Sequence, residues 1–383
     1  MGFARGQEVP FAIRSGGHSL TGASTNDGGL VINLARLNHV EILDAATGRI
    51  RVGPGARWSH VAEALLPHGL AISSGDYGGV GVGGLATAGG IGFLGRKYGL
   101  TIDHMIAADV VLGDGTLVRA STEEHPELFW ALRGAGGNLG IVTSFELLAR
   151  PVGDVVFLRL VYYAADLARL LERWGEVVQG APRELTSFLY TARRPYAQIM
   201  AVFAESDTDA DDALAPLLDV APVVDQQALR VPYARIMHAD DAPYYGSADA
   251  MLLSNGFASH LTAELSGEVA DALRSGTSRW LAIRAVGGAV NDVDPSATAF
   301  AHRRQSFSIS DIGSRETDYL RYWDRLRKHT SGLYINFESD PRPQRLHDAY
   351  PGATLQRLSR VKAAYDPDNV FNQAFPIPIV HAG

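Results

Sequence analysis

Glycine is concentrated in one stretch of the chain, Gly75–Leu100, whose sequence is GDYGGVGVGGLATAGGIGFLGRKYGL. The stretch holds eleven glycines in 26 residues, and Asp76 is its only charged residue before Arg96. Flexible linkers combine glycine with serine, whereas these glycines alternate with Val, Leu, Ala and Ile. Because glycine permits positive φ and close backbone approach, the run suits main-chain N–H groups that face a phosphate-bearing ligand. A tight, buried turn between strands is the alternative interpretation.

Three of these glycines, Gly79, Gly81 and Gly84, also match the dinucleotide-binding pattern G-x-G-x-x-G, with Asp103 about twenty residues further on. That pattern has to open a helix, yet three more glycines follow in LATAGGIG. Each glycine costs about 1 kcal/mol in a helix interior. We therefore expect no Rossmann helix here.

Two further stretches make the interpretation of the glycine run more specific. Arg14–Ser19 reads RSGGHS and follows the apolar run Val9–Ile13, so a strand is expected to deliver a loop with two glycines and a histidine. Glu127–Thr143 reads ELFWALRGAGGNLGIVT. In this order and spacing, the three stretches resemble the FAD-linked oxidases of the berberine-bridge-enzyme-like family, within the vanillyl-alcohol-oxidase superfamily. The resemblance runs from Met1 nearly to the C-terminus and is weakest in the middle of the chain.

Length and composition limit the partners of the protein. The chain of 383 residues is long enough for two domains with sizeable cores. Its net charge of −8, without a basic tract, predicts that nucleic acid is not a partner. The chain has no cysteine, which removes disulfides, thiolate chemistry and a cysteinyl cofactor bond. We expect a monomer.

No apolar run approaches the roughly 20 residues that span a bilayer, so no membrane association is expected. The absence of a signal-peptide pattern predicts a cytoplasmic protein. Members of the resembled family carry about one more βαβ-like unit before the position of Met1. We therefore expect an N-terminally truncated cofactor domain, which would leave secretion open.

The fold class expected is α+β, with two domains. Residues 1–150 are expected to form an FAD-binding domain, 151–340 a substrate domain, and 341–383 a segment that returns to the FAD domain. In the first domain we expect strands at Gly29–Ala35, Val40–Leu43, Gly48–Val52, Met105–Leu112, Thr116–Ala120 and Ile141–Leu148, and helices at His60–Leu66, capped by Ser59, and His125–Leu132.

In the substrate domain we expect an antiparallel sheet covered by helices on one face. Strands are expected at Val155–Tyr163, Thr186–Thr191, Gln198–Phe203, Arg279–Gly288, Phe307–Ile309 and Tyr334–Phe337. Helices are expected at Leu167–Gln179, Ala210–Leu218 and Asp318–Lys328, and a last helix is expected to end at Asp366-Pro367.

The resemblance implies a set of residues that contact FAD. They are Arg14, Ser15, Gly16, Gly17, His18, Ser19, Asp76, Tyr77, Gly81, Val82, Gly83, Gly84, Ile91, Gly137, Val142 and Asn336. The loop from Arg14 to Ser19 would supply backbone and side-chain donors to the pyrophosphate. Gly137 and Val142 would lie near the adenosine half.

His18 matches the family histidine that bonds to the benzo-ring methyl carbon of the flavin. A second anchor in doubly linked relatives is a cysteine, and Tyr77 occupies that position here. A tyrosine cannot form the thioether, so the resemblance implies FAD linked covalently through His18 only. A histidine that merely packs on the flavin is the alternative. Val80 matches the position that controls oxygen access, where valine goes with oxidase behaviour.

The catalytic base of plant members is not carried over. Phe337 stands where some members have a catalytic tyrosine, and the family carboxylate or glutamine falls near Ile309. Tyr334 belongs to the Y-x-N pair that the family directs at the flavin, although YINF could also be an ordinary edge strand. We take Tyr334 as the catalytic candidate, with Tyr190 and His302 behind it; an unperturbed phenol has a pKa of about 10, which would have to fall.

No metal site is predicted, because His238–Asp241 (HADD) is typical of a solvated loop. The resemblance implies an oxidase that passes hydride from a C–H bond next to an alcohol or amine to FAD and then to molecular oxygen, giving hydrogen peroxide. The alternatives are a flavin dehydrogenase that reacts poorly with oxygen and a degenerate protein that binds FAD or an aromatic ligand without turnover. The sequence does not name the small-molecule substrate.

Overall fold

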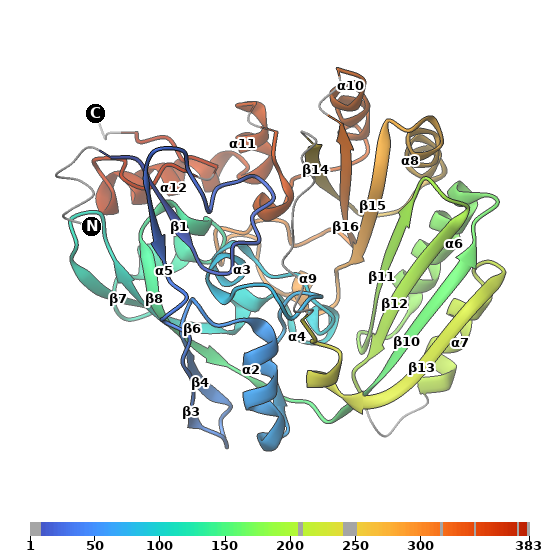
Figure 1. Ribbon diagram of the computed structural model, residues 1–383, viewed down its shortest axis with the longest axis horizontal. Coiled ribbons are helices and arrows are strands. Elements are labelled where there is room, and N and C mark those ends of the chain that lie inside the picture. The colour runs from blue at the N-terminus through green and yellow to red at the C-terminus, as the bar shows by residue number, and fades with distance from the viewer. Residues whose placement is uncertain are drawn as a thin grey trace.

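The computed structural model describes residues 9–205, 210–239, 251–314, 317–340, 342–373 and 375–380. Two lobes lie side by side, one built from short sheets and helices and the other around a seven-stranded sheet (Figure 1). The expected α+β class with an antiparallel second sheet is therefore confirmed.

The first lobe is organised around a five-stranded antiparallel sheet of strand order β3-β4-β8-β6-β7. Its strands are β3 (Val40–Asp44), β4 (Arg49–Val52), β6 (Met105–Val111), β7 (Leu117–Ser121) and β8 (Ile141–Leu148). Two small pairs join β1 (Phe11–Arg14) to β2 (Leu30–Asn33), and β5 (Leu70–Ala71) to β9 (Arg150–Pro151). The helices of this lobe are α2 (Trp58–Leu65), α3 (Val82–Ala88), α4 (Gly95–Tyr98) and α5 (Pro126–Leu132).

The second lobe contains the antiparallel sheet of strand order β13-β10-β12-β11-β15-β16-β14. Its strands are β10 (Asp154–Tyr163), β11 (Leu185–Ala192), β12 (Tyr196–Phe203), β13 (Val223–Pro232), β14 (Met251–Ala258), β15 (Ser278–Ala285) and β16 (Phe307–Ser314). Its helices are α6 (Leu167–Gly180), α7 (Ala210–Leu218), α8 (Ala263–Ser275) and α10 (Thr317–Leu326), while the short α9 (Ala289–Asp292) packs beside α4 of the first lobe.

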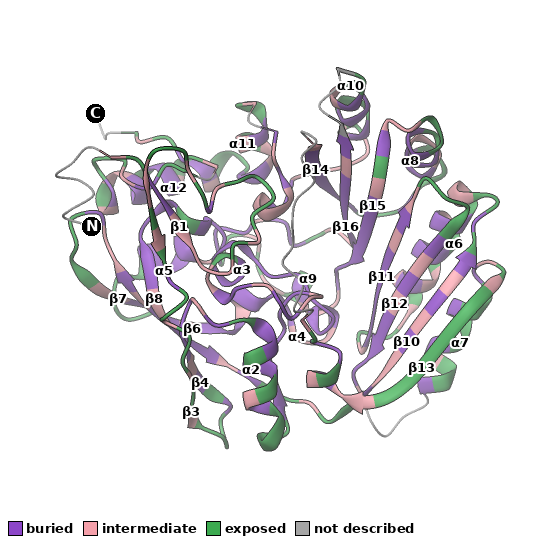
Figure 2. Ribbon diagram, in the orientation of Figure 1, coloured by how far each residue is buried: buried purple, intermediate pink, exposed green. Residues whose placement is uncertain are grey.

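The two faces of this sheet pack against different partners. Side chains alternate along a strand, so Leu189 of β11 packs with the helices α6, α8 and α10, while its neighbour Phe188 packs with the first lobe. Phe188 stacks on Phe93 of the first lobe with ring centroids 4.7 Å apart. The central strands are buried and the edge strand β13 is exposed (Figure 2). The helix-free face of the sheet is thus the face that meets the first lobe.

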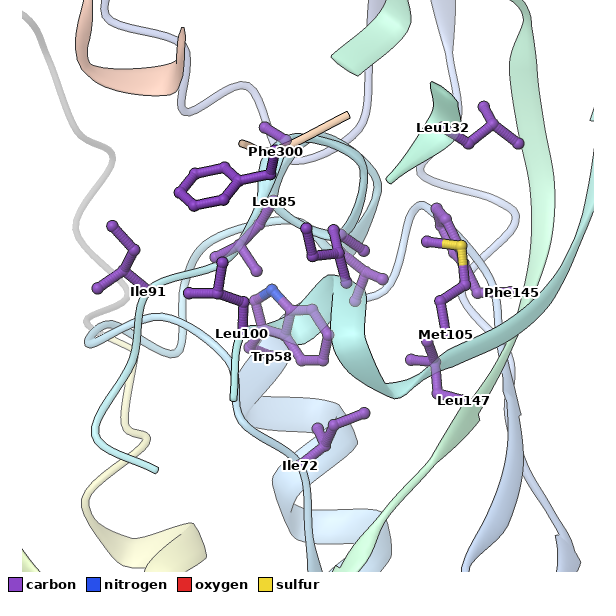
Figure 3. Packing of buried hydrophobic residues seen from close by; sticks show 14 of the residues in the cluster. Trp58, Ile72, Leu85, Ile91, Leu100, Met105, Leu132, Phe145, Leu147 and Phe300 are labelled. Carbon is purple, nitrogen blue, oxygen red and sulfur yellow. The ribbon is translucent and has the colours of Figure 1, made fainter. Parts of the chain in front are cut away.

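The glycine run is wrapped around the core of the first lobe. Its apolar residues Leu85, Ile91 and Leu100 are buried in the same cluster as Trp58 of α2 (Figure 3). These side chains anchor the run in the core; most of its glycines are buried too, and Gly84 is exposed. The buried part of the run matches the alternative interpretation as a buried turn, and the ligand-facing backbone stays a prediction.

The C-terminal helices, α11 (Gln344–Ala349) and α12 (Gly352–Tyr365), pack on the first lobe (Figure 1). The buried Lys362 donates to the carbonyl oxygens of Asn138 and Phe371 at 2.8 and 2.6 Å and pairs with Asp366 at 2.6 Å. A buried ammonium is stable only when it is paired and hydrogen-bonded. These contacts hold the tail against the loop before β8.

Several expected elements are wrong in detail. A helix, α3, does begin within the G-x-G-x-x-G pattern, but it ends after two turns at Gly89, whose φ is 155°. Helix α2 begins at Trp58 without a side-chain cap from Ser59. Residues 335–337 form a 3-10 turn, not a strand. Strands β13 and β14 and helix α8 were not expected as separate elements.

Candidate active site

A cavity of about 890 Å³ lies between the two lobes, within the size range of ligand sites. Most of the residues assigned to FAD contact line it, together with the catalytic candidate. They are Ser15, Gly16, Gly17, His18, Ser19, Asp76, Tyr77, Gly81, Gly83, Gly84, Ile91, Gly137, Val142, Tyr334 and Asn336. Segments separated by up to 320 residues in the chain therefore converge on one hollow.

One side of the cavity is made of main chain. We call it the cradle: the loop 15–19, the stretch 75–84 and the loop 136–142, all from the first lobe. Gly16 and Gly81 touch back to back, because a Cβ on either would lie under 3.0 Å from the backbone of the other. The Ser15 hydroxyl joins the same two segments, donating to the Pro54 carbonyl at 2.5 Å and accepting from the Gly83 N–H at 3.1 Å.

Other glycines of the cradle face open space. A Cβ at Gly84 or Gly137 would meet no atom within 4 Å, and both residues line the cavity. Their missing side chains leave room for a bulky ligand that lies against the backbone. This arrangement fits FAD, whose phosphates and rings need a long hollow with few protruding side chains.

Two residues of the expected FAD set lie outside the cavity lining. Val82 is completely buried in the core, and its N–H donates to the Ala56 carbonyl at 2.9 Å. Arg14 ends β1, and its side-chain carbons lie against Gly17. Neither residue is therefore in the lining, and a direct contact of either with FAD stays a prediction. The hydroxyl of Ser15 is likewise used within the protein.

His18 and Tyr77 lie together in the cradle, with ring centroids 5.8 Å apart. Burial and the nearby charge of Arg57 lower the pKa of His18 from its usual value. A lowered pKa keeps the imidazole neutral at physiological pH, and a neutral ring nitrogen is the nucleophilic form.

The opposite side of the cavity is made of side chains, and we call it the wall: Arg284 from the sheet, with Tyr334, Asn336 and Phe337 from the segment after α10. Tyr190 of the sheet contacts Asp76 but lies outside the lining. The Tyr334 oxygen accepts from the Gly90 N–H at 3.1 Å and from Asn336 Nδ2 at 3.0 Å. Burial nevertheless raises the pKa of Tyr334 to about 12, since it outweighs these two hydrogen bonds. The shift is opposite to the lowering that the sequence argument required.

An ion pair joins the wall to the cradle. Arg284 Nε donates to Asp76 Oδ2 at 2.8 Å, and the Tyr190 hydroxyl donates to the same oxygen at 2.7 Å. The Arg284 guanidinium also stacks over the ring of Phe337, 4.6 Å from its centroid. Burial and the Asp76 carboxylate raise the pKa of Tyr190 well above its usual value, so this phenol is a donor and not a base.

The remaining base candidates are not in the lining. His302 is buried, its Nε2 contacts the Ala349 carbonyl at 3.0 Å, and burial lowers its pKa to about 4. Ile309 belongs to the core under the helices, so the position compared with the family carboxylate faces away from the cavity. Its neighbours Ser308 and Ser310 are on the other face by strand alternation.

Sequence reasoning missed Arg284. The signal was present: a charged residue interrupts the apolar strand WLAIRAV, and a buried strand tolerates a charge only with a partner. What the sequence could not supply was the partner, because Asp76 is 208 residues away in the chain.

Within the described part of the chain, no group of three or more His, Cys, Asp or Glu side chains is arranged to hold a metal ion. Asp240 and Asp241 of the HADD stretch fall outside that part. No helix among the described residues has the length and apolar character to cross a bilayer.

Comparison with known proteins agrees with this geometry. Residues 1–121 match the family model for the FAD binding domain, and residues 333–378 match the model described as berberine and berberine like. The chain is 32% identical to a chitooligosaccharide oxidase of Gibberella zeae, over 95% of this chain and 81% of that protein. It is 27% identical to (R)-6-hydroxynicotine oxidase of Paenarthrobacter nicotinovorans, over 96% and 86%.

A solved structure of glucooligosaccharide oxidase from Acremonium strictum, described as containing 6-S-cysteinyl, 8α-N1-histidyl FAD, superposes with a TM-score of 0.84 at 25% identity. The match covers 99% of this chain and 88% of that one. The alignment with an oxidase that is 32% identical over 95% of this chain, together with the family matches at residues 1–121 and 333–378, shows that this chain belongs to the berberine-bridge-enzyme-like family of FAD-linked oxidases and is an FAD-dependent oxidoreductase.

Proposed function

We propose that the protein oxidises a C–H bond next to an alcohol or amine of a small molecule and transfers the two electrons to molecular oxygen. For an alcohol the balance is R₂CH–OH + O₂ → R₂C=O + H₂O₂. The observation that carries this proposal is the cavity itself, in which a glycine cradle faces a polar wall. FAD bound there would accept the hydride and pass the electrons on to oxygen.

The cradle holds the cofactor in this proposal. The residues facing the cavity at 15–19, 81–84 and 137–142 would bind FAD through main-chain groups, with His18 bonded to the benzo-ring methyl carbon. The neutral state of His18 supports such a bond. Tyr77 occupies the side where a doubly linked relative has cysteine, so His18 would be the only attachment. Val80, a small apolar residue of the lining, leaves space for oxygen.

The wall positions the substrate and takes its proton. Tyr334 is the phenol on the wall side of the lining, and two N–H donors point at its oxygen. The same donors stabilise the phenolate once it forms. We propose that Tyr334 accepts the hydroxyl or amine proton, and that its pKa of about 12 makes the ionised fraction small at neutral pH. Asn336 also donates to the Gly84 carbonyl at 3.2 Å and so ties the base to the cradle.

Flavin retention and peroxide production test this function. Purified protein precipitated with acid should keep its yellow colour, and the variant His18→Ala should bind FAD but lose it on denaturation. Screening alcohols, sugars and cyclic amines should give peroxide in an amount equal to the oxygen consumed. Reduction of the flavin by substrate with little peroxide would mean a dehydrogenase, and protein that binds FAD but is reduced by none of the compounds would mean a binding protein.

A further inference from the structure

The segment that carries the catalytic candidate runs along the outer edge of the seven-stranded sheet. Strand β14 ends that sheet, and the segment 331–339 lies beside it. The Ser331 N–H donates to the Phe257 carbonyl at 2.8 Å, and the Ser339 N–H donates to the Leu253 carbonyl at 2.8 Å. Between these two contacts the segment has more residues than the strand, so it has to leave the edge. The excess includes the 3-10 turn already described, and it carries wall residues to the cavity.

Asn255 supplies, at this gap, the hydrogen bonds that a neighbouring strand would otherwise make. It lies on β14 halfway between the two contacts. Its Oδ1 accepts from the Tyr334 N–H at 2.6 Å, and its Nδ2 donates to the Tyr334 carbonyl at 3.0 Å. One side-chain amide, with its acceptor and its donor, thus satisfies both main-chain groups of the residue whose phenol lines the cavity.

Asn255 is itself held in place, and it lies behind the wall. It is completely buried and stands outside the cavity lining. Arg345 Nη2 donates to the main-chain carbonyl of Asn255 at 2.8 Å, and the same guanidinium pairs with the buried Glu338. Glu338 in turn accepts from the Ser254 hydroxyl at 3.2 Å. Because Asn255 does not line the cavity, its effect on a substrate there has to pass through Tyr334.

We propose that Asn255 is a positioning residue, which holds the main chain of Tyr334 so that the phenol stays between its two donors. This rests on the proposed function, in which Tyr334 accepts the proton of the substrate. The Gly90 N–H and Asn336 Nδ2 lie 3.1 and 3.0 Å from the phenol oxygen, and a shift of the main chain would change both distances. A displacement of about 1 Å can slow a reaction by about 100-fold.

Asn255→Ala in the holoenzyme tests the proposal. Anaerobic rapid mixing with a substrate from the peroxide screen should show flavin reduction slowed by about 10- to 100-fold, with unchanged FAD content. In the Tyr334→Phe background the same substitution should change the rate by no more than about twofold, because a positioning residue has no effect once its target is gone. Ser187→Ala is the matched control: Ser187 is also completely buried and accepts from Trp174 Nε1 at 3.1 Å, but on the helix-covered face of the sheet.

A second readout needs no substrate. In protein whose tyrosines carry ¹³C at Cζ, the signal that is missing from Tyr334→Phe belongs to Tyr334. Asn255→Ala should shift this signal, because the phenol carbon senses the hydrogen bonds at its oxygen, and Ser187→Ala should leave it in place. Asn255→Asp is the conservative variant. It keeps the acceptor for the Tyr334 N–H and, as a neutral acid, also the donor, so it should retain more of the reduction rate than Asn255→Ala.

An unshifted Tyr334 signal or a wild-type reduction rate in Asn255→Ala would overturn the proposal. Equal slowing in the wild-type and Tyr334→Phe backgrounds would also overturn it, because the loss would then be one of general structure. If Asn255→Ala does not fold, Asn255→Ser, which has one polar side-chain atom in place of two, is held to the same criteria. If Tyr334→Phe itself reduces its flavin at the wild-type rate, the proposed base is wrong, and the carbon signal alone decides whether Asn255 positions the phenol.

Discussion

The cradle and the wall enclose the same cavity by opposite means. The cradle presents backbone, and its key residues are glycines. Gly16 and Gly81 can touch because neither has a side chain, and at Gly84 the missing side chain leaves the surface of the cavity bare. The wall presents side chains, each held by another side chain, as Asp76 holds Arg284. A surface of main chain can fit one conserved shape of cofactor, whereas a surface of side chains can be changed residue by residue. In the proposed function, this difference would separate the residues that bind the cofactor from those that select the substrate.

The largest effect is expected for a substitution on the wall, which should slow the reduction of the flavin. Tyr334→Phe removes the proposed base, and a general base contributes about 10²–10⁴-fold in rate. Anaerobic rapid mixing should show flavin reduction slowed by that range, with unchanged FAD content. Tyr350→Phe is the control, because Tyr350 is also a buried tyrosine but lies outside the cavity lining.

The pH profile distinguishes a base from a structural contact. The base must be ionised to act, and its pKa in the folded protein is raised to about 12. Below that pKa the ionised fraction grows about tenfold for each pH unit, so the wild-type reduction rate should climb steadily between about pH 7 and 10 without a plateau. Arg284 and Asp76 are the charges that act on Tyr334, with opposite signs. Should Tyr334→Phe keep the wild-type rate and slope, the tyrosine only supports the flavin.

The sequence predicted the residues of the cradle better than it predicted the contacts within the wall. Strand β8 is predicted to the residue, because its apolar run and the glycines before it are local signals. The glycine stretches also predicted a ligand site, because the conformational freedom of glycine is a property of the residue itself and does not depend on tertiary packing. The neighbours of Tyr334 could not be read in this way: its partner Gly90 is 244 residues distant, and its pKa depends on burial that only tertiary packing creates.

The next largest effect is expected for a substitution in the cradle, which should lower the stability of the folded protein. Gly81 has φ of −71° and ψ of 144°, which any residue can adopt, so Gly81→Ala introduces no backbone strain of its own. The added Cβ would instead overlap the backbone of Gly16, which has no side-chain end that could move aside. Overpacking of this kind costs about 1–3 kcal/mol, and thermal unfolding should report it together with low FAD content.

Gly267→Ala is the control for that substitution. Gly267 is in helix α8, and a Cβ there would meet no atom within 4 Å. Alanine is favoured over glycine in a helix by up to about 1 kcal/mol, so the control should unfold at a slightly higher temperature. If Gly81→Ala is as stable as the wild type and fully loaded with FAD, the two loops do not depend on their close approach.

The smallest effect is expected at Gly84, three residues further along the same run, and it separates two reasons for glycine. Gly84 lies in the first turn of α3 with open space where a Cβ would be, so Gly84→Ala should stabilise the flavin-free protein by up to about 1 kcal/mol. The same methyl group would project toward the cofactor and weaken FAD binding by about 1 kcal/mol, roughly fivefold. Both quantities are measured in the His18→Ala background, from which FAD can be removed: unfolding of the apo form gives the first, and FAD titration the second. Opposite signs would mean that Gly84 serves the ligand while Gly81 serves the fold. A loss of stability in the flavin-free form would contradict that distinction and make the whole run a structural feature.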